Sequence, residues 1–494
     1  MVSREDIEPA KTGHEASFFR SPNLLLLCAV AVADGADQQL LYSSFRALEA
    51  DLHLELVDLL WMQLAQGVAL ALAGPFWAVF VDNGAKHSVV LSIGAMGWGV
   101  VTVIMAGVES LWMAVVLRGS AGFFLASLLP VVQSMTAEAV ERSSRGRAFG
   151  IIELSNRLCG QMLTTLFVTA ISNGEYGGYA GWRIGFLVIG LLSILLAAAV
   201  SFCMEDSPRP WRPHQVGVFS ELKKLVSFMQ VRTFSIIVAQ GIVGCIPWVA
   251  LNLTTLYFQY AGMTDARAGL AFGLCLVGQG IGHFAGGCFG DYLAEWSPYH
   301  GRAVVAQTSV LLGMPVVFAM FYLLPPEPWT FAYQAILCLV LGLVATWCAN
   351  GCNKPMFIDI VPEDCTASAV AWEFCIQNGF ASIAGNAVLN AVSGSFGYSR
   401  AAADQQVSEM TRPERLGNAN ALGHALLFSL LVFWSLCFCL YSSLHFTYKS
   451  DYMRLRPDGG CARSQPKVTG SSERTALLNK EVDHKPVDAP VHTL

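Results

Sequence analysis

The sequence predicts an all-α integral membrane protein whose twelve transmembrane helices form two pseudo-symmetric six-helix bundles. Of its 494 residues, 54% are hydrophobic and only 13% are charged, whereas a soluble domain carries about 25% charged residues. The apolar residues form long uninterrupted runs, and a helix needs about 20 of them to cross the hydrocarbon core of a bilayer. These observations exclude a soluble multi-domain protein.

Twelve apolar runs are long enough to span a membrane. In the first half they cover residues 23–45, 58–81, 88–106, 111–137, 147–171 and 182–204. In the second half they cover 234–260, 268–291, 303–324, 331–358, 366–395 and 422–445. We therefore expect a tail at 1–22, bundles at 23–204 and 233–448 joined by a linker at 205–232, and a disordered tail at 449–494.

The distribution of basic residues predicts the orientation, because cytoplasmic loops collect lysine and arginine. With the N-terminus inside, the tails and inner loops hold 22 of the 30 basic residues and the outer loops hold six. Both termini are therefore expected in the cytoplasm. A signal peptide cleaved after Ala33 is disfavoured, since Asp34 and Asp37 follow the apolar run directly.

Several classes of function find no support in the sequence. The net charge of −6 gives no basic stripe for nucleic acid. The 14 cysteines lie mostly inside apolar runs and form no CxxC pair or zinc-type cluster. There is no phosphate-binding GxxxxGK[ST] loop and no evident nucleophile-base pair, so we expect neither ATP drive, nor an enzyme, nor a metal or other cofactor.

An internal repeat relates the two halves. The second and eighth runs end in similar turns, PFWAVFVDNGAKH at 75–87 and GGCFGDYLAEWSPYHGR at 286–302, with Asp82 and Asp291 at matching places. The fourth and tenth runs both have a proline eight residues before a glutamate. Two marks that recur in the same order predict a duplicated six-helix unit.

These motifs resemble those of the major facilitator superfamily. Asp82 and Lys86 keep the places of the superfamily's turn after the second helix, although Ala78 and Asn83 depart from it; Arg118 and Gly122 match its fourth helix. The resemblance implies a secondary transporter in which two six-helix bundles rock about a central cavity. It also implies that Asp82, Lys86, Asp291 and Arg302 form gating turns, which could otherwise simply cap short loops.

Four segments resemble the spinster-like branch of that superfamily, including its plant and algal members. They are ADGADQQLL around Asp37, QGIVGCIPW at 240–248, GDYLAEWSPYHGRAVVAQ at 290–307 and NKPMFIDIVPE at 353–363. Gln38 departs from the branch, which usually has a charged residue there. The branch implies an amphiphilic substrate such as a lysophospholipid or sphingoid lipid. A small organic anion held by Arg118 or Arg157, or a non-transporting sensor or scaffold, are the alternatives.

Five ionisable residues fall inside spans of the first half, where each costs about 2.5 to 3.5 kcal/mol at a helix centre. They are Asp34, Asp37, Arg118, Glu153 and Arg157. Glu153 and Arg157 are four residues apart and share a helical face, so Arg118 needs Asp37 or Asp34 from another helix. One carboxylate is left over to exchange a proton. We hypothesise that Asp37 and Arg118 form the protonation switch; a static ion pair is the alternative.

Other polar residues in the spans allow two interpretations. Glu153, Arg157 and Gln161 could contact substrate or form a packing network between helices. In the second half, Glu373 is an acid without an evident partner and is a candidate for the cavity, whereas His283 is better explained by packing.

The polar C-terminal tail contains a candidate sorting signal. Glu473 stands four residues before the pair Leu477 and Leu478, a pattern similar to the dileucine signals that sorting adaptors bind. It favours an endosomal, lysosomal or vacuolar membrane over the cell surface. The expected partners are thus a small-molecule or lipid substrate, protons, membrane lipids and sorting adaptors.

Overall fold

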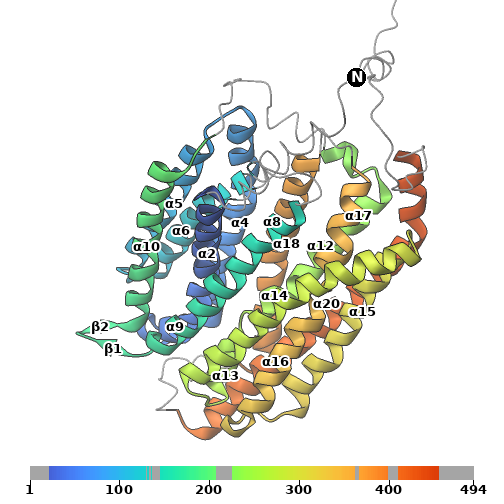
Figure 1. Ribbon diagram of the computed structural model, residues 1–494. Helices are drawn as coiled ribbons and strands as arrows, with labels where there is room; N and C mark the ends of the chain where they lie inside the picture. The colour runs from blue at the N-terminus through green and yellow to red at the C-terminus, as the bar shows by residue number, and fades with distance from the viewer. Residues whose placement is uncertain are drawn as a thin grey trace, which may run out of the picture. The chain divides into compact units, whose positions relative to one another are not determined.

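Helices form nearly all of the described chain (Figure 1). The computed structural model describes residues 22–128, 131–132, 135, 145–206, 225–361, 366–398 and 410–455. The first half contains α2 (Pro22–Ser43), α3 (Phe45–Leu52), α4 (Leu56–Asp82), α5 (His87–Met105), α6 (Leu111–Leu125), α8 (Arg145–Leu154), the π-helix η2 (Ser155–Met162), α9 (Leu163–Ser172) and α10 (Gly181–Cys203). Strands β1 (Glu175–Tyr176) and β2 (Tyr179–Ala180) form a short antiparallel hairpin before α10.

The second half repeats this helical organisation. It contains α12 (Arg232–Leu251), α13 (Thr254–Tyr260), α14 (Asp265–Trp296), α15 (Gly301–Phe318), η3 (Ala319–Leu323), η4 (Pro328–Thr330), α16 (Phe331–Ala345), η5 (Ala349–Asn353), α17 (Lys354–Asp359), α18 (Thr366–Ser395) and α20 (Arg412–Leu455). We call the end of the molecule where α2 begins and α20 finishes the terminal end, and the opposite end, with β1 and β2, the hairpin end (Figure 1).

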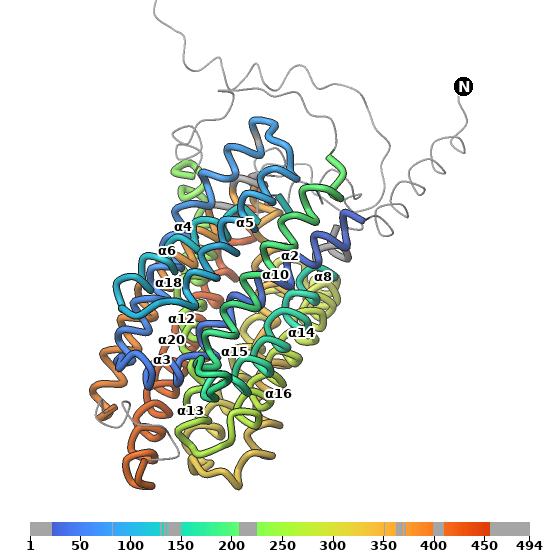
Figure 2. The backbone as a smooth tube through the Cα atoms, turned by 90° about the vertical axis from the view of Figure 1, so that its left-hand side faces the viewer, coloured from blue at the N-terminus to red at the C-terminus, as the bar shows by residue number. Residues whose placement is uncertain are grey.

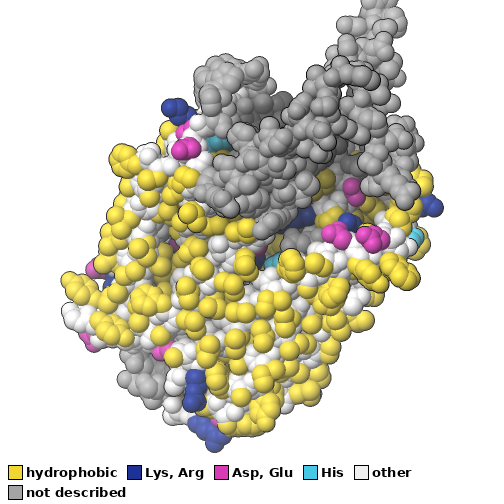
Figure 3. Space-filling view, viewed as in Figure 1, with side chains coloured by type: hydrophobic (Ala, Val, Ile, Leu, Met, Phe, Trp, Pro, Cys, Tyr) yellow, Lys and Arg dark blue, Asp and Glu magenta, His cyan; other side chains and the backbone are white. Residues whose placement is uncertain are grey.

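Nine helical segments of the described chain are long and apolar enough to span a membrane, and α6 is a shorter apolar helix. Two more helices complete the twelve expected spans: the broken helix α8–η2–α9, and α18. These two carry Glu153, Arg157 and Glu373, which lowers their hydropathy. Figure 3 shows hydrophobic side chains over the flank of the helices, as a surface facing lipid requires.

Several predicted spans differ from the helices observed. The fifth run is divided into α8, η2 and α9, and the ninth into α15 and η3. The seventh run is broken at Asn252 between α12 and α13, and the tenth is divided into α16, η5 and α17. The last helix is longer than expected and continues to Leu455, so residues 449–455 are helical rather than part of a disordered tail. Asp451 explains this extension: its Oδ2 accepts hydrogen bonds from the Thr233 backbone N (2.8 Å) and Oγ1 (2.7 Å), which fastens the end of α20 to the start of α12.

Small residues let neighbouring helices approach closely where polar groups must meet. A Cβ on Gly160 of η2 would lie 2.5 Å from the carbonyl oxygen of Val32, and one on Gly35 would lie 2.5 Å from that of Asn156. Contacts this short exclude a side chain, so α2 and η2 pack backbone against backbone. This close packing places the polar side chains of the two helices within hydrogen-bond distance.

The two halves meet along two pairs of helices. α4 packs against α18, and η2 and α9 pack against α14, while within the halves α10 packs along α5 and α14 along α16 (Figures 1 and 2). The charged residues of the candidate site and their hydrogen-bond donors lie on the helices of these two contacts and on α2, α5, α6 and α17.

Candidate functional site

A buried ion pair joins α2 to α6 in the middle of the first half. The Oδ1 and Oδ2 atoms of Asp37 each lie 3.1 Å from an Nη atom of Arg118, and both side chains are buried. Gln66 Nε2 (2.7 Å) and Trp98 Nε1 (3.3 Å) also donate to this carboxylate. Gly122 allows the approach, because a Cβ there would lie 2.2 Å from the Gln66 carbonyl oxygen. Besides the Arg118 cation, Asp37 thus has one amide donor and one indole donor.

Asp34, one helical turn before Asp37, lies in a ring of uncharged partners. Gln38 Nε2 (2.8 Å) and Asn156 Nδ2 (3.0 Å) donate to its Oδ2. Gln161 closes the ring by donating to Gln38 Oε1 (2.9 Å) and Asn156 Oδ1 (2.8 Å). Within the described part of the chain, no ion pair joins Asp34 to a basic residue. Of the three acids predicted inside spans of the first half, Asp34, Asp37 and Glu153, Asp34 is therefore the one without an ion pair to a described residue.

Arg157 connects the two halves of the molecule. Its Nε lies 2.9 Å from Glu153 Oε1, as the four-residue spacing predicted. Its Nη1 donates to Gln161 Oε1 (3.3 Å) and, on α14 in the second half, to Gln279 Oε1 (3.0 Å). Glu153 is 48% exposed although it lies within a spanning helix. The Glu153–Arg157 pair therefore lies at the contact between the two halves.

The second half contributes three ionisable groups, Glu373, Lys354 and His283, on helices near this contact. Glu373 on α18 accepts a hydrogen bond from Gln377 Nε2 (2.8 Å) and has no ion pair with a described residue. Lys354, at the start of α17, has an exposed side chain. Its charge acts on Glu153, on His283 of α14 and on Glu373. Lys354 is therefore within electrostatic range of one acid from each half.

A second polar cluster joins the halves at the hairpin end. Glu49 of α3 is fully buried and accepts hydrogen bonds from Tyr260 Oη of α13 (2.9 Å) and Tyr398 Oη (2.6 Å). Arg46 Nη1 lies 3.3 Å from Glu49 Oε2, and its guanidinium lies 5.2 Å from the centre of the Tyr260 ring. We call Arg46, Glu49, Tyr260 and Tyr398 the hairpin-end cluster. It links the two halves at that end by hydrogen bonds.

The predicted gating turns lie at the terminal end. Arg302 Nη2 donates to Asp291 Oδ1 (2.8 Å), and its Nη1 donates to the carbonyl of Gly351 on the neighbouring helix (3.3 Å). Lys86 is exposed at the start of α5. The side chain of Asp82 lies outside the described part of the structure. The sorting-signal residues Glu473, Leu477 and Leu478 likewise lie outside the described residues.

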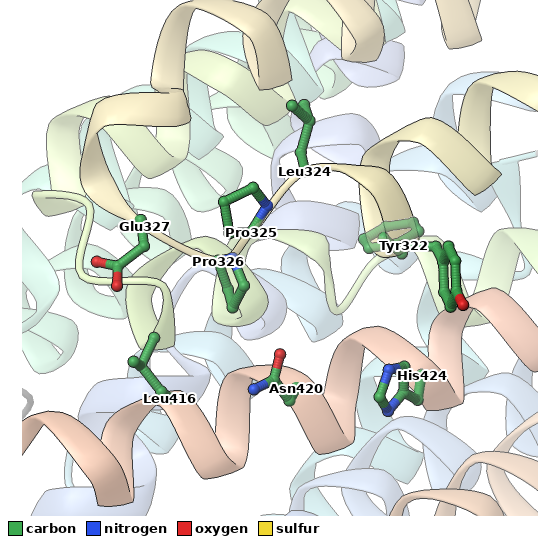
Figure 4. A pocket seen from close by; sticks show the side chains of 9 residues that line it. Tyr322, Leu324, Pro325, Pro326, Glu327, Leu416, Asn420 and His424 are labelled. Carbon is green, nitrogen blue, oxygen red and sulfur yellow. The ribbon is translucent and has the colours of Figure 1, made fainter.

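A pocket of about 370 Å³ lies near the hairpin end, away from the charged groups. It is formed by the turn that follows η3 and by the first turns of α20 (Figure 4), with Tyr322, Pro326 and His424 among its lining residues. Glu327 on its rim is paired with Arg412 (2.5 Å). None of the predicted site residues lines this pocket.

Two helical halves that pack along α4–α18 and along η2/α9–α14, with charged residues at their contact and a hydrogen-bonded cluster at one end, are the arrangement expected of a membrane transport protein. The sequence profile of the Major Facilitator Superfamily matches residues 27–386, more than half of the chain. The chain belongs to this superfamily of transporters. The recognition of the superfamily from its motifs is thereby confirmed.

Solved structures share this fold. A bacterial homologue of the human lysosomal transporter Spinster, in an inward-facing and unoccupied conformation, superposes with a TM-score of 0.70 at 18% identity, over 87% of this chain and 97% of that one. The nucleoside transporter NupG superposes with a TM-score of 0.59 at 12% identity, over 87% of this chain and 99% of that one. A D-xylose-proton symporter superposes with a TM-score of 0.58 at 14% identity, over 83% of this chain and 96% of that one. At these identities the likeness shows the fold.

Curated sequences give a shorter match. The multidrug resistance protein MdtG of Escherichia coli is 28% identical over 180 residues, which are 35% of this chain and 41% of that protein. The chain therefore matches less than half the length of these relatives.

The structure brings together most of the residues that the sequence singled out. Asp37 pairs with Arg118 and Glu153 with Arg157, as expected. Sequence reasoning missed Lys354, because its place near the end of the tenth run groups it with the inner-loop cations. It also missed the hairpin-end cluster, whose members lie at the ends of apolar runs and look like loop residues.

We predict that Asp37 and Arg118 are energetically coupled. Asp37→Asn or Arg118→Gln alone leaves one buried charge without its partner, and each should lower the free energy of unfolding by about 3 to 5 kcal/mol. The double variant should lose clearly less than the sum of the two. Unfolding of the purified chain in detergent measures this.

Arg412→Gln is the control for this measurement, because it removes an ion pair in which the arginine is 72% exposed. It should change stability little. Strictly additive losses at Asp37 and Arg118 would show that the two side chains are not coupled.

We predict that acid favours the closed hairpin end. Burial raises the pKa of Glu49, while the Arg46 charge and the hydrogen bonds from Tyr398 and Tyr260 act in the opposite direction. The closed arrangement therefore binds a proton more tightly than an open one in which Glu49 meets water. This stabilisation is fully present below the ordinary glutamate pKa of about 4.3 and is lost as the pH rises through the raised pKa.

Spin labels at Tyr179 and Trp329, one exposed residue from each half at this end, report the closure as a distance distribution, in a background without reactive cysteines. Glu49→Gln should make the distribution independent of pH, and Glu175→Gln on the exposed strand β1 should not. A pH dependence that persists in Glu49→Gln would contradict the assignment to Glu49.

Proposed function

We propose that this transporter is secondary active, works by alternating access, is coupled to protons and moves a small amphiphile of the lysophospholipid or sphingoid-lipid class. The observation that supports this proposal best is the set of side chains that surround Asp34. This acid lies inside a spanning helix and accepts two hydrogen bonds from uncharged amides, with no cation paired to it among the described residues. A carboxyl group in that situation is suited to bind and release a proton.

The arrangement of partners distinguishes Asp34 from Asp37. The Asp37 carboxylate contacts Arg118 through both oxygens and has two further donors, so its proton uptake must first break a buried ion pair. Asp34 needs no such step. We therefore propose Asp34 as the proton carrier, with the Asp37–Arg118 pair as the alternative switch, and Glu153, Arg157 and Glu373 as residues that face the substrate.

Similarities to other proteins support the class of substrate and the coupling. The bacterial structure of the same fold is a homologue of Spinster, a human lysosomal transporter, and the D-xylose transporter is a proton symporter. The spinster-like segments at 240–248, 290–307 and 353–363 point to the same branch. The cations Arg157 and Lys354 favour small organic anions as the second candidate substrates.

Transport in proteoliposomes tests the proposal. We expect purified chain to take up labelled lysophospholipid faster when a proton gradient is applied, and we expect Asp34→Asn to remove the stimulation by the gradient. Sphingoid base and small organic anions are tested in parallel. Glu109→Gln, on the exposed loop between α5 and α6, is the matched control and should retain the stimulation.

The outcomes separate the candidates. Loss of the stimulation in Asp37→Asn but not in Asp34→Asn would assign the switch to the Asp37–Arg118 pair. Uptake of small organic anions but not of lipids would contradict the amphiphile and assign small organic anions as the substrate class. Failure of all these substrates to move would contradict the transport proposal for them and favour a sensor or scaffold.

We also propose that the protein resides in an endosomal, lysosomal or vacuolar membrane with both termini in the cytoplasm, where sorting adaptors would bind Glu473, Leu477 and Leu478. Replacing both leucines by alanine should move a fluorescent fusion to the cell surface. Glu481→Ala, outside the motif, should leave it inside the cell. An unchanged location of the leucine variant would contradict the signal.

A further inference from the structure

Lys354 is held at its position by the short π-helix that precedes it. η5 ends at Asn353, whose Nδ2 donates to Gln240 Oε1 (2.9 Å) and whose Oδ1 accepts from Tyr441 Oη (3.1 Å). These bonds fix the backbone on the side of α12 and α20. The next side chain, that of Lys354, is exposed.

The exposed side chain of Lys354 lies beside α14, where the two halves meet. Lys354 directly follows η5, which packs against α14, and Gln279 of α14 accepts a hydrogen bond from Arg157 of the first half. The electrostatic influence of Lys354 on Glu153, His283 and Glu373 agrees with this position. In the described chain it has neither a hydrogen bond nor an ion pair. An ammonium group inside a membrane protein is costly unless it is paired or hydrated, so this cation is available for a negative ligand.

The nearby carboxylates do not neutralise Lys354 equally. Glu153 already contacts Arg157 through an ion pair of 2.9 Å. Glu373 has only a hydrogen bond from Gln377 (2.8 Å) and no described cation in contact. Glu373 is thus the carboxylate best able to balance the charge of Lys354 when the cavity is empty.

Arg157 approaches the same region from the opposite half. Its hydrogen bond to Gln279 holds it against α14, the helix against which η5, directly before Lys354, also packs. One cation from each half therefore lies beside α14. An anion bound there is attracted to both halves at once.

We propose that Lys354 binds a phosphate or carboxylate group of the substrate, with Arg157 as the second cation and Glu373 as the competing acid. This inference rests on the proposed function and narrows it: the amphiphile carries an anionic headgroup, so a lysophospholipid fits the site and a sphingoid base does not. The phosphate oxygens accept charge-assisted hydrogen bonds from the lysine.

Equilibrium binding to the full-length chain in detergent tests the proposal. The probes are a water-soluble short-chain lysophosphatidate and the monoacylglycerol with the same acyl chain, which differ only in the phosphate. We expect the wild-type chain to prefer the lysophosphatidate. Lys354→Gln should weaken its binding about tenfold, the size expected for one hydrogen bond to a charged group, and leave monoacylglycerol binding unchanged.

Three further variants make the test specific. Lys354→Arg keeps the charge and should retain most of the preference. Glu373→Gln removes the competing acid and should strengthen lysophosphatidate binding, but not when combined with Lys354→Gln. Lys449→Gln, whose lysine lies over the Tyr299 ring outside the cavity, should bind like wild type. Thermal unfolding of each variant checks that it is folded.

Equal affinity for the two probes, or an unchanged preference in Lys354→Gln, would overturn the inference. If Lys354→Gln does not fold, the inference would be overturned by a Glu373→Gln variant that binds lysophosphatidate no more tightly than the wild type. The transport proposal is contradicted by a different result. Binding that is selective for phosphate and depends on Lys354, without uptake in proteoliposomes, would support the binding site and contradict transport. Uptake of lysophospholipid with the same KM in wild type and Lys354→Gln would support transport and contradict the site.

Discussion

An ionised side chain inside a bilayer must meet an opposite charge or face a protein-lined cavity, and the first bundle is organised around one such group. The Asp37 carboxylate on α2 is satisfied by Gln66 from α4, Trp98 from α5 and Arg118 from α6. Four helices must therefore converge on a single buried acid. Gly122 meets this requirement by letting α6 approach the backbone of α4. The pair thus accounts for the packing of this bundle as well as for a charge at its centre.

The π-helices explain how polar groups reach the space between the halves. A π-turn widens the helix and leaves its backbone hydrogen bonds less regular, which is tolerated where side chains compensate. In η2 (Ser155–Met162) this turn presents Asn156 and Gln161 to α2 and Arg157 to α14. In η5 the Asn353 side chain faces α12 and α20, and Lys354 follows it. Each irregular segment thus supplies both an anchor and a neighbouring cation.

The sequence predicts those parts of the site that depend on charge inside an apolar run. Asp37, Arg118, Glu153 and Arg157 stand out because their burial requires partners, and a spacing of four residues identifies one pair directly. Uncharged amides such as Asn156 give no such signal, because only the three-dimensional approach of α2 and η2 shows what they contact. The cluster around Glu49 also escapes prediction, since Tyr398 lies some 350 residues away in the chain and π-helices have no sequence signature.

The strength of the hairpin-end cluster sets how much free energy is needed to open that end of the molecule. The bonds that join the halves there include those from Tyr260 and Tyr398 to Glu49 and from Asn173 to Asp265. A net contribution of about 0.5 to 1.5 kcal/mol for each gives a few kcal/mol in all. Moving a two-state equilibrium from 1:99 to 99:1 takes about 5.5 kcal/mol of differential binding. The two quantities are of the same order, so the hydrogen bonds of the hairpin-end cluster are weak enough for differential ligand binding of ordinary size to open that end.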